Sequence, residues 1–430
     1  MRIELGNESV AWEVRVADGA EPSAMRLHRE WNGDCCRLSL ENTGNVAQRI
    51  AEVVAFRCDM PYEADTPFYG EGFNMLSQYK GTLSSFQNIT GLSDAGHYKL
   101  PQTDGFFTVY NLLMLYPSAH NAALMAFSSC HRFNGQFRFN PDCLEVVLTC
   151  EGIQVPPGAT MALEEFFFGT CEDPSELLQR LGQQIGVNHP PLPYEAPPCG
   201  WSSWSCYGRA VTEEDVFDNL ATIKSEFPDL KFIQLDDGYQ THMGDWLAPN
   251  PNFPNGIDSL CCKIKEAGFE PAIWVAPFIA AKDSDLLRDH PDWFVKDDQG
   301  QPLDSSTVSF GGWVEKPWYM LDGTHPGAQD YLRMVFRTMR EKWHCRYFKL
   351  DANTWGALPW GHRHDPNATA IEAYRAGMQA LREGAGEGSF VLGCNAALWP
   401  SLGTVHGMRV TNDIKYNWRC IRGLAEQGFP

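Results

Sequence analysis

The sequence lacks the cysteine spacings that mark zinc sites or disulfide frameworks. Its 14 cysteines stand singly or as adjacent pairs, and none forms a Cys-x-x-Cys pair. Several lie inside apolar stretches, where a free cysteine behaves as a small hydrophobic residue. Reduced thiols in a cytoplasmic protein fit this pattern better than disulfides. His362, His364 and Asp365 have no third His or Cys at metal-ligand spacing, so we interpret them as part of a polar loop and expect no metal and no other cofactor.

Basic residues and long apolar runs are also scarce. The chain has 34 Lys and Arg against 54 Asp and Glu, which gives a net charge of -20. Such a charge repels phosphate backbones and anionic lipid surfaces, so we expect neither nucleic acid nor a membrane as a partner. No apolar run approaches the roughly 20 residues needed to span a bilayer, and the first residues contain no apolar signal segment. A soluble protein is therefore expected, and a homo-oligomer is left open.

The first 170 residues predict an antiparallel β-sandwich. Short alternating runs, such as residues 10–16 and 144–148, are separated by Gly, Asn, Asp and Pro. Asp173, Pro174 and Glu176 then form the start signal of a helix. Five prolines follow between residues 186 and 198. We therefore expect a β-sandwich domain with a trailing helix over residues 1–185 and a proline-rich linker over residues 186–198.

From residue 199 onward the pattern changes to strands that end in acidic or aromatic residues and alternate with helices. This alternation is typical of parallel βα units. The clearest strand covers residues 346–351, where Lys349 and Asp351 share one face while Phe348 and Leu350 share the other. Such a strand suits a (β/α)8 TIM-type barrel, whose active sites lie at the carboxyl ends of the strands.

Only six such strands are found before the sequence ends, whereas a closed barrel of this type has eight. We therefore expect the barrel over residues 199–430 to be incomplete, with its last strands missing. Open sheet edges pair with other chains. The 430-residue chain is accordingly expected to be poorly soluble and to have weak activity or none.

The predicted strand ends bring carboxylates and tryptophans to one rim. The candidates are Trp204, Asp236, Asp237, Trp274, Lys349, Asp351, Cys394, Arg409 and Asp413. The rim has no glycine-rich loop of the kind that binds phosphate and no serine at a nucleophile elbow. Carboxylates accept hydrogen bonds from hydroxyls, and an indole packs against the apolar face of a pyranose, so the set indicates a site for a neutral sugar. Two carboxylates flanking a glycosidic bond can act as nucleophile and general acid/base. The alternative is a sugar-binding barrel without turnover.

Eight short motifs follow one another in order: GWSSW (200–204), QLDDGY (234–239), GDW (244–246), IWVAPF (273–278), HPDW (290–293), YFKLD (347–351), LGC (392–394) and GMR (407–409). Each motif is weak alone, but the ordered set resembles glycoside hydrolase family 36, the microbial, melibiase-like α-galactosidases. The resemblance implies a β-sandwich, a barrel and a C-terminal β-domain. Because the last two strands and that domain have no counterpart here, the chain is expected to be a fragment or a truncated gene product.

The resemblance implies a retaining mechanism and assigns its residues. Asp351 corresponds to the nucleophile that closes the fourth strand, and Asp413 to the acid/base after the sixth. Lys349 corresponds to a lysine that contacts sugar hydroxyls beside the nucleophile. Trp204 and Cys394 lie at the expected strand ends, with less specific roles as substrate-binding residues.

The same resemblance implies how the sugar is recognised. Asp236 and Asp237 correspond to a pair that binds the 4- and 6-hydroxyls, Trp274 to a pocket wall, and Arg409 to a hydrogen-bond donor on the sugar side. Asn395 stands where the family pattern has a small glycine. The choice between a 2-hydroxyl and a 2-acetamido group is therefore left open.

The implied function is hydrolysis of terminal α-galactosyl residues by double displacement. The expected partner is an oligosaccharide of the raffinose or melibiose kind, with a terminal α-galactose. Two alternatives stay open at this point. One is a galactosyl transferase of the raffinose-synthase type, in which a sugar hydroxyl replaces water, and the other is an inactive galactoside-binding fragment.

Overall fold

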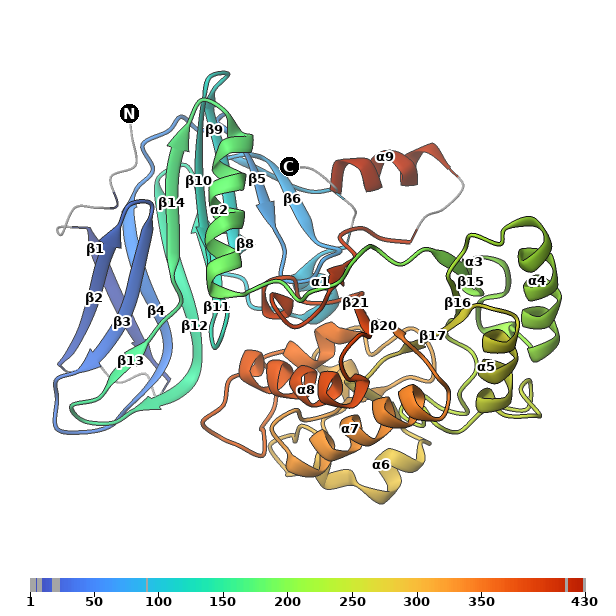
Figure 1. Cartoon of the computed structure of the whole chain (residues 1–430). Coiled ribbons are helices and arrows are strands. Elements are labelled where there is room, and N and C mark those ends of the chain that lie inside the picture. The colour runs from blue at the N-terminus through green and yellow to red at the C-terminus, as the bar shows by residue number, and fades with distance from the viewer. Residues whose placement is uncertain (1–4, 6–9, 18–23, 90–91, 414–416, 428–430) are drawn as a thin grey trace.

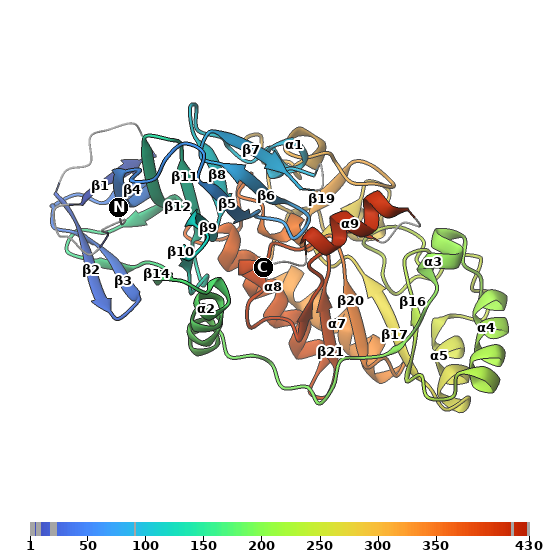
Figure 2. The same ribbon diagram turned by 90° about the horizontal axis from the view of Figure 1, so that it is seen from above.

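The computed structural model describes residues 5, 10–17, 24–89, 92–413 and 417–427 (Figure 1). The first part of the chain forms an antiparallel β-sandwich, and the second forms a parallel sheet flanked by helices. Figures 1 and 2 show the two parts side by side, with the sandwich at the blue and green end of the chain.

The sandwich contains two sheets packed over one hydrophobic core. The first has the strand order β1 (Ala11–Val16), β4 (Gln48–Asp59), β12 (Cys143–Val155), β11 (Asn134–Phe139) and β8 (Phe107–Tyr110). The second has the order β13 (Thr160–Ala162), β3 (Cys35–Asn42), β14 (Phe166–Cys171), β10 (Asn121–Phe127), β9 (Leu112–Ser118), β5 (Pro67–Glu71), β6 (Gln78–Thr82) and β7 (Ser85–Asn88), with β2 (Met25–Asn32) paired to β3. Phe56, Phe127, Phe137 and Phe166 meet in the core because alternate residues of each strand point inward.

Helix α2 (Pro174–Asn188) follows the sandwich and packs against β10 and β14. It begins as predicted: the Asp173 carboxylate accepts a hydrogen bond from the Ser175 amide at 2.9 Å, and Leu177 and Leu181 are buried. It extends three residues into the predicted linker, since the first helix-breaking residue of that segment is Pro190.

The second part contains six parallel strands in sequence order: β15 (Gly200–Ser202), β16 (Phe232–Leu235), β17 (Glu270–Val275), β20 (Tyr347–Leu350), β21 (Phe390–Gly393) and β22 (Gly407–Met408). The main helices between them are α3 (Trp204–Tyr207), α4 (Glu213–Glu226), α5 (Ile257–Glu266), α7 (Pro326–Glu341) and α8 (Ala370–Ala385). The six predicted strands are confirmed in order and direction. One detail differs from the prediction: Trp204 does not end the first strand, because β15 stops at Ser202 and Trp204 is the first residue of α3.

Within the part of the chain that the structure describes, this sheet is open, with β15 and β22 at its edges. The predicted incomplete barrel of about six strands agrees with this sheet, whereas its membership of the eight-stranded TIM-barrel type stays a prediction. The apolar side of β20 is as expected: Phe348 is fully buried and its ring lies 5.2 Å from that of Phe336 on α7. Lys349 therefore points to the opposite side of the strand.

A long excursion separates β17 from α7. It contains β18 (Ile279–Ala281) paired with β19 (Trp318–Met320), the short helix α6 (Asp285–Asp289), and the 3-10 turns η2 (Pro291–Trp293) and η3 (Ser305–Thr307). The remaining elements are α1 (Asp94–Tyr98), η1 (Gly208–Ala210), η4 (Asn353–Ala357), η5 (Trp399–Ser401) and α9 (Trp418–Gln427). Searching the described residues for a helix long and apolar enough to cross a bilayer yields none.

Hydrogen bonds join the sandwich to the parallel-sheet part. Arg132 pairs with Glu372 of α8 at 3.1 Å, and Glu151 of β12 accepts from the Ala370 amide at 2.9 Å. The Trp399 indole donates to the Phe127 carbonyl at 2.6 Å. These contacts fix the two parts against each other, with the strand ends facing the sandwich.

Candidate active site

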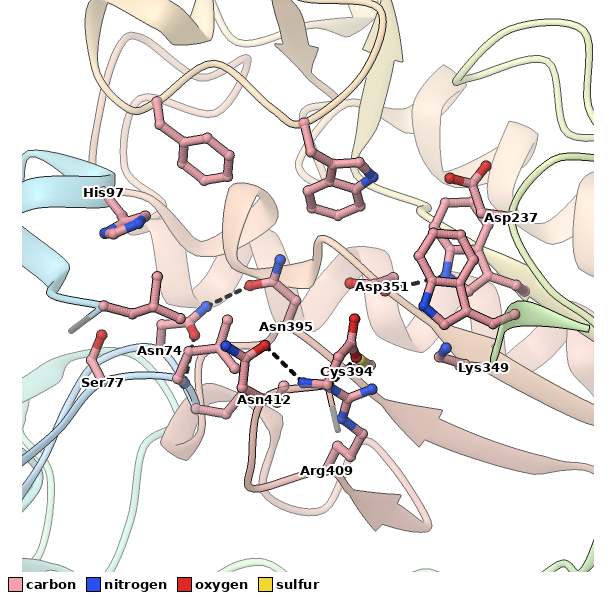
Figure 3. Close-up of a pocket in the computed structure, with 18 of the residues that line it drawn as sticks. Asn74, Ser77, His97, Asp237, Lys349, Asp351, Cys394, Asn395, Arg409 and Asn412 are labelled. Atoms are coloured by element: carbon pink, nitrogen blue, oxygen red, sulfur yellow. Dashed lines mark hydrogen bonds and ion pairs between the residues drawn. The ribbon is translucent and has the colours of Figure 1, made fainter. Parts of the chain in front are cut away.

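A cavity of about 480 Å³ lies at the carboxyl ends of the parallel strands (Figure 3). All nine residues predicted for the site line it: Trp204, Asp236, Asp237, Trp274, Lys349, Asp351, Cys394, Arg409 and Asp413. The structure thus brings together residues that are spread over more than 200 positions of the sequence. Their individual roles stay predictions.

Strand register explains why these side chains meet. Parallel pairing aligns Trp274 with Lys349, and Lys349 with Leu392, so successive strands end at the same level. Gly200 is needed at the start of β15, because a Cβ atom there would lie 2.0 Å from the Phe232 carbonyl oxygen. The carboxyl end of a parallel sheet is where ligand sites of α/β proteins form.

Two hydrogen bonds orient the Asp351 carboxylate. One oxygen accepts from the Ala352 amide at 2.7 Å, and the other accepts from the Trp274 indole at 3.2 Å. Ala352 has φ of 52°, in the left-handed region that is costly for a residue with a Cβ. Trp274 is held by Trp246, whose ring lies 5.8 Å away at 70°. The carboxylate is therefore fixed from both sides at the floor of the cavity.

Lys349 and Asp236 form a buried ion pair beside Asp351. The Lys349 ammonium lies 2.9 Å from an Asp236 oxygen, which also accepts a hydrogen bond from the side-chain amide of Gln234 at 2.5 Å. Burial lowers the pKa of Lys349, but the carboxylates of Asp236 and Asp351 outweigh it and hold the pKa above its usual value. The lysine is therefore charged, and it screens the two carboxylates from each other.

Asp237 has one carboxylate oxygen that lacks a partner. Its Oδ1 accepts from Gln240 at 2.8 Å and from Arg209 at 3.3 Å, whereas the buried Oδ2 has no hydrogen bond. Burial raises the pKa of this carboxyl to about 6. Because buried polar atoms are nearly always paired, an unpaired acceptor in a cavity is ready to accept from a ligand hydroxyl.

Arg409 and Asp413 form an ion pair of 2.6 Å at the outer side of the cavity. Asp413 is about half exposed, with 49% of its side chain accessible to solvent. The predicted role of Arg409 was a donor to the sugar, but here its guanidinium is directed to Asp413 and to the Thr411 carbonyl. Cys394 is buried, and burial raises the pKa of its thiol. This thiol is therefore protonated and unreactive.

The sandwich contributes a wall that the sequence analysis missed. It consists of Asn74, Met75, Leu76, Ser77, Leu92, His97 and Tyr98. Figure 3 shows Asn74, Ser77 and His97 across the cavity from Asp237 and Lys349. The periodicity of the sandwich strands gave no signal for this wall, because these residues lie in loops and in the short helix α1.

Asp94 holds this wall in place. Its carboxylate accepts from the Phe73 and Asn74 amides at 3.0 and 3.1 Å, and from the Tyr79 hydroxyl at 3.0 Å. Burial raises the pKa of Asp94 to about 6. Asn74 then donates to the Asn395 side chain at 2.9 Å, which connects the sandwich to the end of β21.

Two aromatic residues of the excursion complete the lining. Phe310 and Trp313 flank Gly311 and Gly312, whose φ values are 82° and 107°. This Phe-Gly-Gly-Trp turn between two strands was a signal that the sequence analysis did not use. Among the residues that the structure describes, no group of three or more His, Cys, Asp or Glu side chains is arranged to hold a metal ion.

The chain is similar in sequence to known glycosidases. Residues 213–379 match the Melibiase family model. An α-galactosidase of Escherichia coli is 30% identical over 162 residues, which cover 36% of this chain and 21% of that protein. The myogenesis-regulating glycosidase of Mus musculus is 28% identical over 160 residues, covering 37% and 22%. The matched segment thus spans about a fifth of the length of these relatives.

Solved structures share the fold. TtGalA, an α-galactosidase from Thermus thermophilus in complex with p-nitrophenyl α-D-galactopyranoside, has a TM-score of 0.65 at 23% identity, covering 90% of this chain and 74% of that one. AgaA from Geobacillus stearothermophilus, a GH36 α-galactosidase, has a TM-score of 0.65 at 14% identity, covering 96% and 66%.

The fold, a β-sandwich beside a parallel βα sheet, is shared with solved structures of glycoside hydrolases. Within that class, the comparisons confirm the resemblance of the chain to the melibiase-like α-galactosidases of glycoside hydrolase family 36.

Proposed function

We propose that this chain carries the catalytic site of a retaining α-galactosidase. The observation that carries the proposal is the meeting of Asp351 and Asp413 with the Asp236 and Asp237 carboxylates around one cavity. A pair of carboxylates can provide the nucleophile and the acid/base, while a second pair can bind hydroxyls. Relatives named α-galactosidases support the choice of sugar.

In the first chemical step, an Asp351 oxygen attacks the anomeric carbon as the bond to the glycosidic oxygen breaks. Asp413 gives its proton to that leaving oxygen. In the second step, Asp413 takes a proton from a water molecule, which attacks the anomeric carbon and displaces Asp351. The hydrogen bonds from the Trp274 indole and the Ala352 amide keep the Asp351 carboxylate oriented for this attack.

Recognition of galactose rests on the inner carboxylates. The unpaired Asp237 oxygen can accept a hydrogen bond from a sugar hydroxyl, and the Lys349–Asp236 pair offers both a donor and an acceptor. A site built to bind a hydroxyl rejects a sugar that lacks it there by about 10⁴-fold or more, because buried groups are left unpaired. The resemblance to the α-galactosidases assigns Asp236 and Asp237 to the 4- and 6-hydroxyls, so we expect an axial 4-hydroxyl to be favoured over an equatorial one.

The test is a rate comparison on three nitrophenyl glycosides, the α-galactoside, the α-glucoside and the α-N-acetylgalactosaminide. We expect the α-galactoside to be hydrolysed with the α-anomer of galactose as the first product, measured by NMR. Equal rates on galactoside and glucoside, or release of the β-anomer, would contradict the proposal. The third substrate tests the 2-position, where Asn395 lines the cavity. Product analysis at high concentrations of a sugar acceptor separates hydrolysis from galactosyl transfer.

A further inference from the structure

A second cavity, of about 450 Å³, lies between the five-stranded sheet of the sandwich and the chain that follows η4. It is close in size to the first cavity and within the range of small-molecule sites. The strands β4, β8, β11 and β12 form its floor, and residues 357–360 with Ile371 form the opposite side. This cavity has no part in the proposed reaction.

The floor of the second cavity is polar, although it is buried. Gln136 and Arg138 on β11 are 6% and 5% exposed, and Asn134 on the same strand is 8% exposed. Thr149 and Glu52 lie on the neighbouring strands and also line the cavity. An interface between two parts of one chain is usually stabilised by apolar contacts, because buried polar groups cost free energy. A floor with this many polar groups is suited to a ligand that has hydrogen-bonding groups of its own.

The charged residues that line the cavity are two arginines, Arg49 and Arg138, and two glutamates, Glu52 and Glu151, so their formal charges sum to zero. The Arg138 guanidinium donates to Glu52 at 3.0 Å and to the Gln136 side-chain oxygen at 3.1 Å. Arg49 donates to the Gly152 carbonyl at 3.2 Å, and Glu151 lies 3.7 Å from Arg363. A lining without net charge favours neither an anionic nor a cationic ligand. The cavity therefore fits a neutral ligand.

Aromatic side chains supply an apolar surface next to these polar groups. Phe73 and Tyr110 lie edge to face with ring centroids 5.8 Å apart, and Trp360 forms part of the opposite side. The Tyr110 hydroxyl is buried and has no hydrogen-bond partner. Buried hydroxyls are normally paired, so this group provides an independent indication of a missing partner.

We propose that this second cavity binds a neutral saccharide unit. Pyranoses combine hydroxyls, which both donate and accept, with an apolar ring face that packs on aromatic side chains. The cavity offers paired amides, hydroxyls and charged groups beside Phe73, Tyr110 and Trp360. It is separate from the first cavity, since the two cavities share no lining residue. Binding of a saccharide in the second cavity does not depend on which reaction the first cavity catalyses.

The test uses calorimetric titration of the Asp237→Ala chain, which weakens the first site, with raffinose, maltose and inorganic phosphate. We expect at least one of the two sugars to bind with a stoichiometry near one, while phosphate does not. Tyr110→Phe in the same background should weaken this binding by about 3- to 10-fold, the value of one hydrogen bond. It should leave the melting temperature unchanged, since the hydroxyl has no partner without a ligand.

Tyr374→Phe is the matched control. Its hydroxyl is bonded to Ser401 at 2.8 Å and lines neither cavity. This variant should lower the melting temperature without changing sugar binding. Trp360→Ala provides a second route, because it removes the aromatic surface opposite the floor. The proposal is overturned if neither sugar binds to the Asp237→Ala chain, if phosphate competes, or if both Tyr110→Phe and Trp360→Ala bind the sugar normally. Hydrolysis by the Tyr110→Phe chain with Asp237 intact reports separately on the first site.

Discussion

The two halves of the first cavity are built from different chemistry. The half formed by the parallel strands carries charges, including the Lys349–Asp236 and Arg409–Asp413 pairs. The half formed by the sandwich, here called the neutral half, lines the cavity without a Lys, Arg, Asp or Glu side chain, and a buried carboxylate behind it, Asp94, binds backbone amides. The difference indicates that the strand ends perform the chemistry, whereas the sandwich shapes and closes the space in which it occurs.

Replacement of Asp351 should have the largest effect. Asp351→Ala removes the proposed nucleophile, so turnover of an α-galactoside should fall by about 10⁴-fold or more. Added azide or formate is expected to restore part of the rate. Asp330→Ala, on the outer side of α7 with 79% of its side chain exposed, is the control and should retain the normal rate. Unchanged turnover in Asp351→Ala would place the nucleophile elsewhere.

Replacement of Asp413 should have a smaller effect that depends on the leaving group. Asp413→Ala should slow hydrolysis of melibiose by about 10²- to 10⁴-fold, the usual contribution of general acid catalysis. A dinitrophenyl galactoside should be affected much less in the first step, because its leaving group needs no proton. The two rate ratios, measured by stopped-flow kinetics, distinguish an acid from a residue that only binds. Equal losses on both substrates would argue against the acid role.

Replacement of Asp94, which lies behind the neutral half, should change the stability of the protein and its binding of substrate. Asp94→Asn leaves a buried group that cannot satisfy all three of its partners, which costs about 1–3 kcal/mol. We expect a lower free energy of unfolding and a raised KM, with kcat nearly unchanged. Chemical denaturation and steady-state kinetics measure the three quantities. A large fall in kcat at constant KM would show that the sandwich takes part in the chemistry after all.

The smallest predicted effect is a pH dependence. The pKa values of Asp94 and Asp237 are both about 6 in the folded chain, above the usual value for aspartate. Between about pH 4 and 6 these two carboxyls therefore bind more protons in the folded state than in the unfolded state, and their contribution makes the free energy of unfolding fall as the pH rises through this range. Asp237→Asn should make the curve flatter. Denaturation at pH 4.5, 5.5 and 6.5 tests this, and a free energy that rises over the range contradicts it.

The sequence predicted the charged half better than the neutral half for a physical reason. Lys349 and Asp351 stand on a strand whose alternation is visible in five residues, and parallel strands must end on one edge. Asn74 reaches the cavity only because Asp94, 20 residues later, binds its amide. No local pattern encodes such a contact. Phe310 and Trp313 are an intermediate case. The sequence shows the two glycines of their turn, but it does not show that this turn lies beside the cavity.

The ends of the strands and helices were predicted less well than their presence in the chain. Trp204 was expected at a strand end and instead opens α3, and α2 runs beyond the predicted start of the linker. Both differences arise where hydrogen bonding, and not side-chain pattern, decides where an element stops. The ordered motifs nonetheless placed all nine candidates on one cavity.

The hydrogen bond between Asn74 and Asn395 joins residues 321 positions apart. Contacts of such long range form late in folding, after the local units that they connect. Refolding should therefore show two stages, an early recovery of the far-ultraviolet signal of both parts and a later gain of substrate binding when they dock. The cavity forms only when the sandwich and the parallel-sheet part dock. Substrate binding therefore measures this docking step, which the far-ultraviolet signal of secondary structure does not detect.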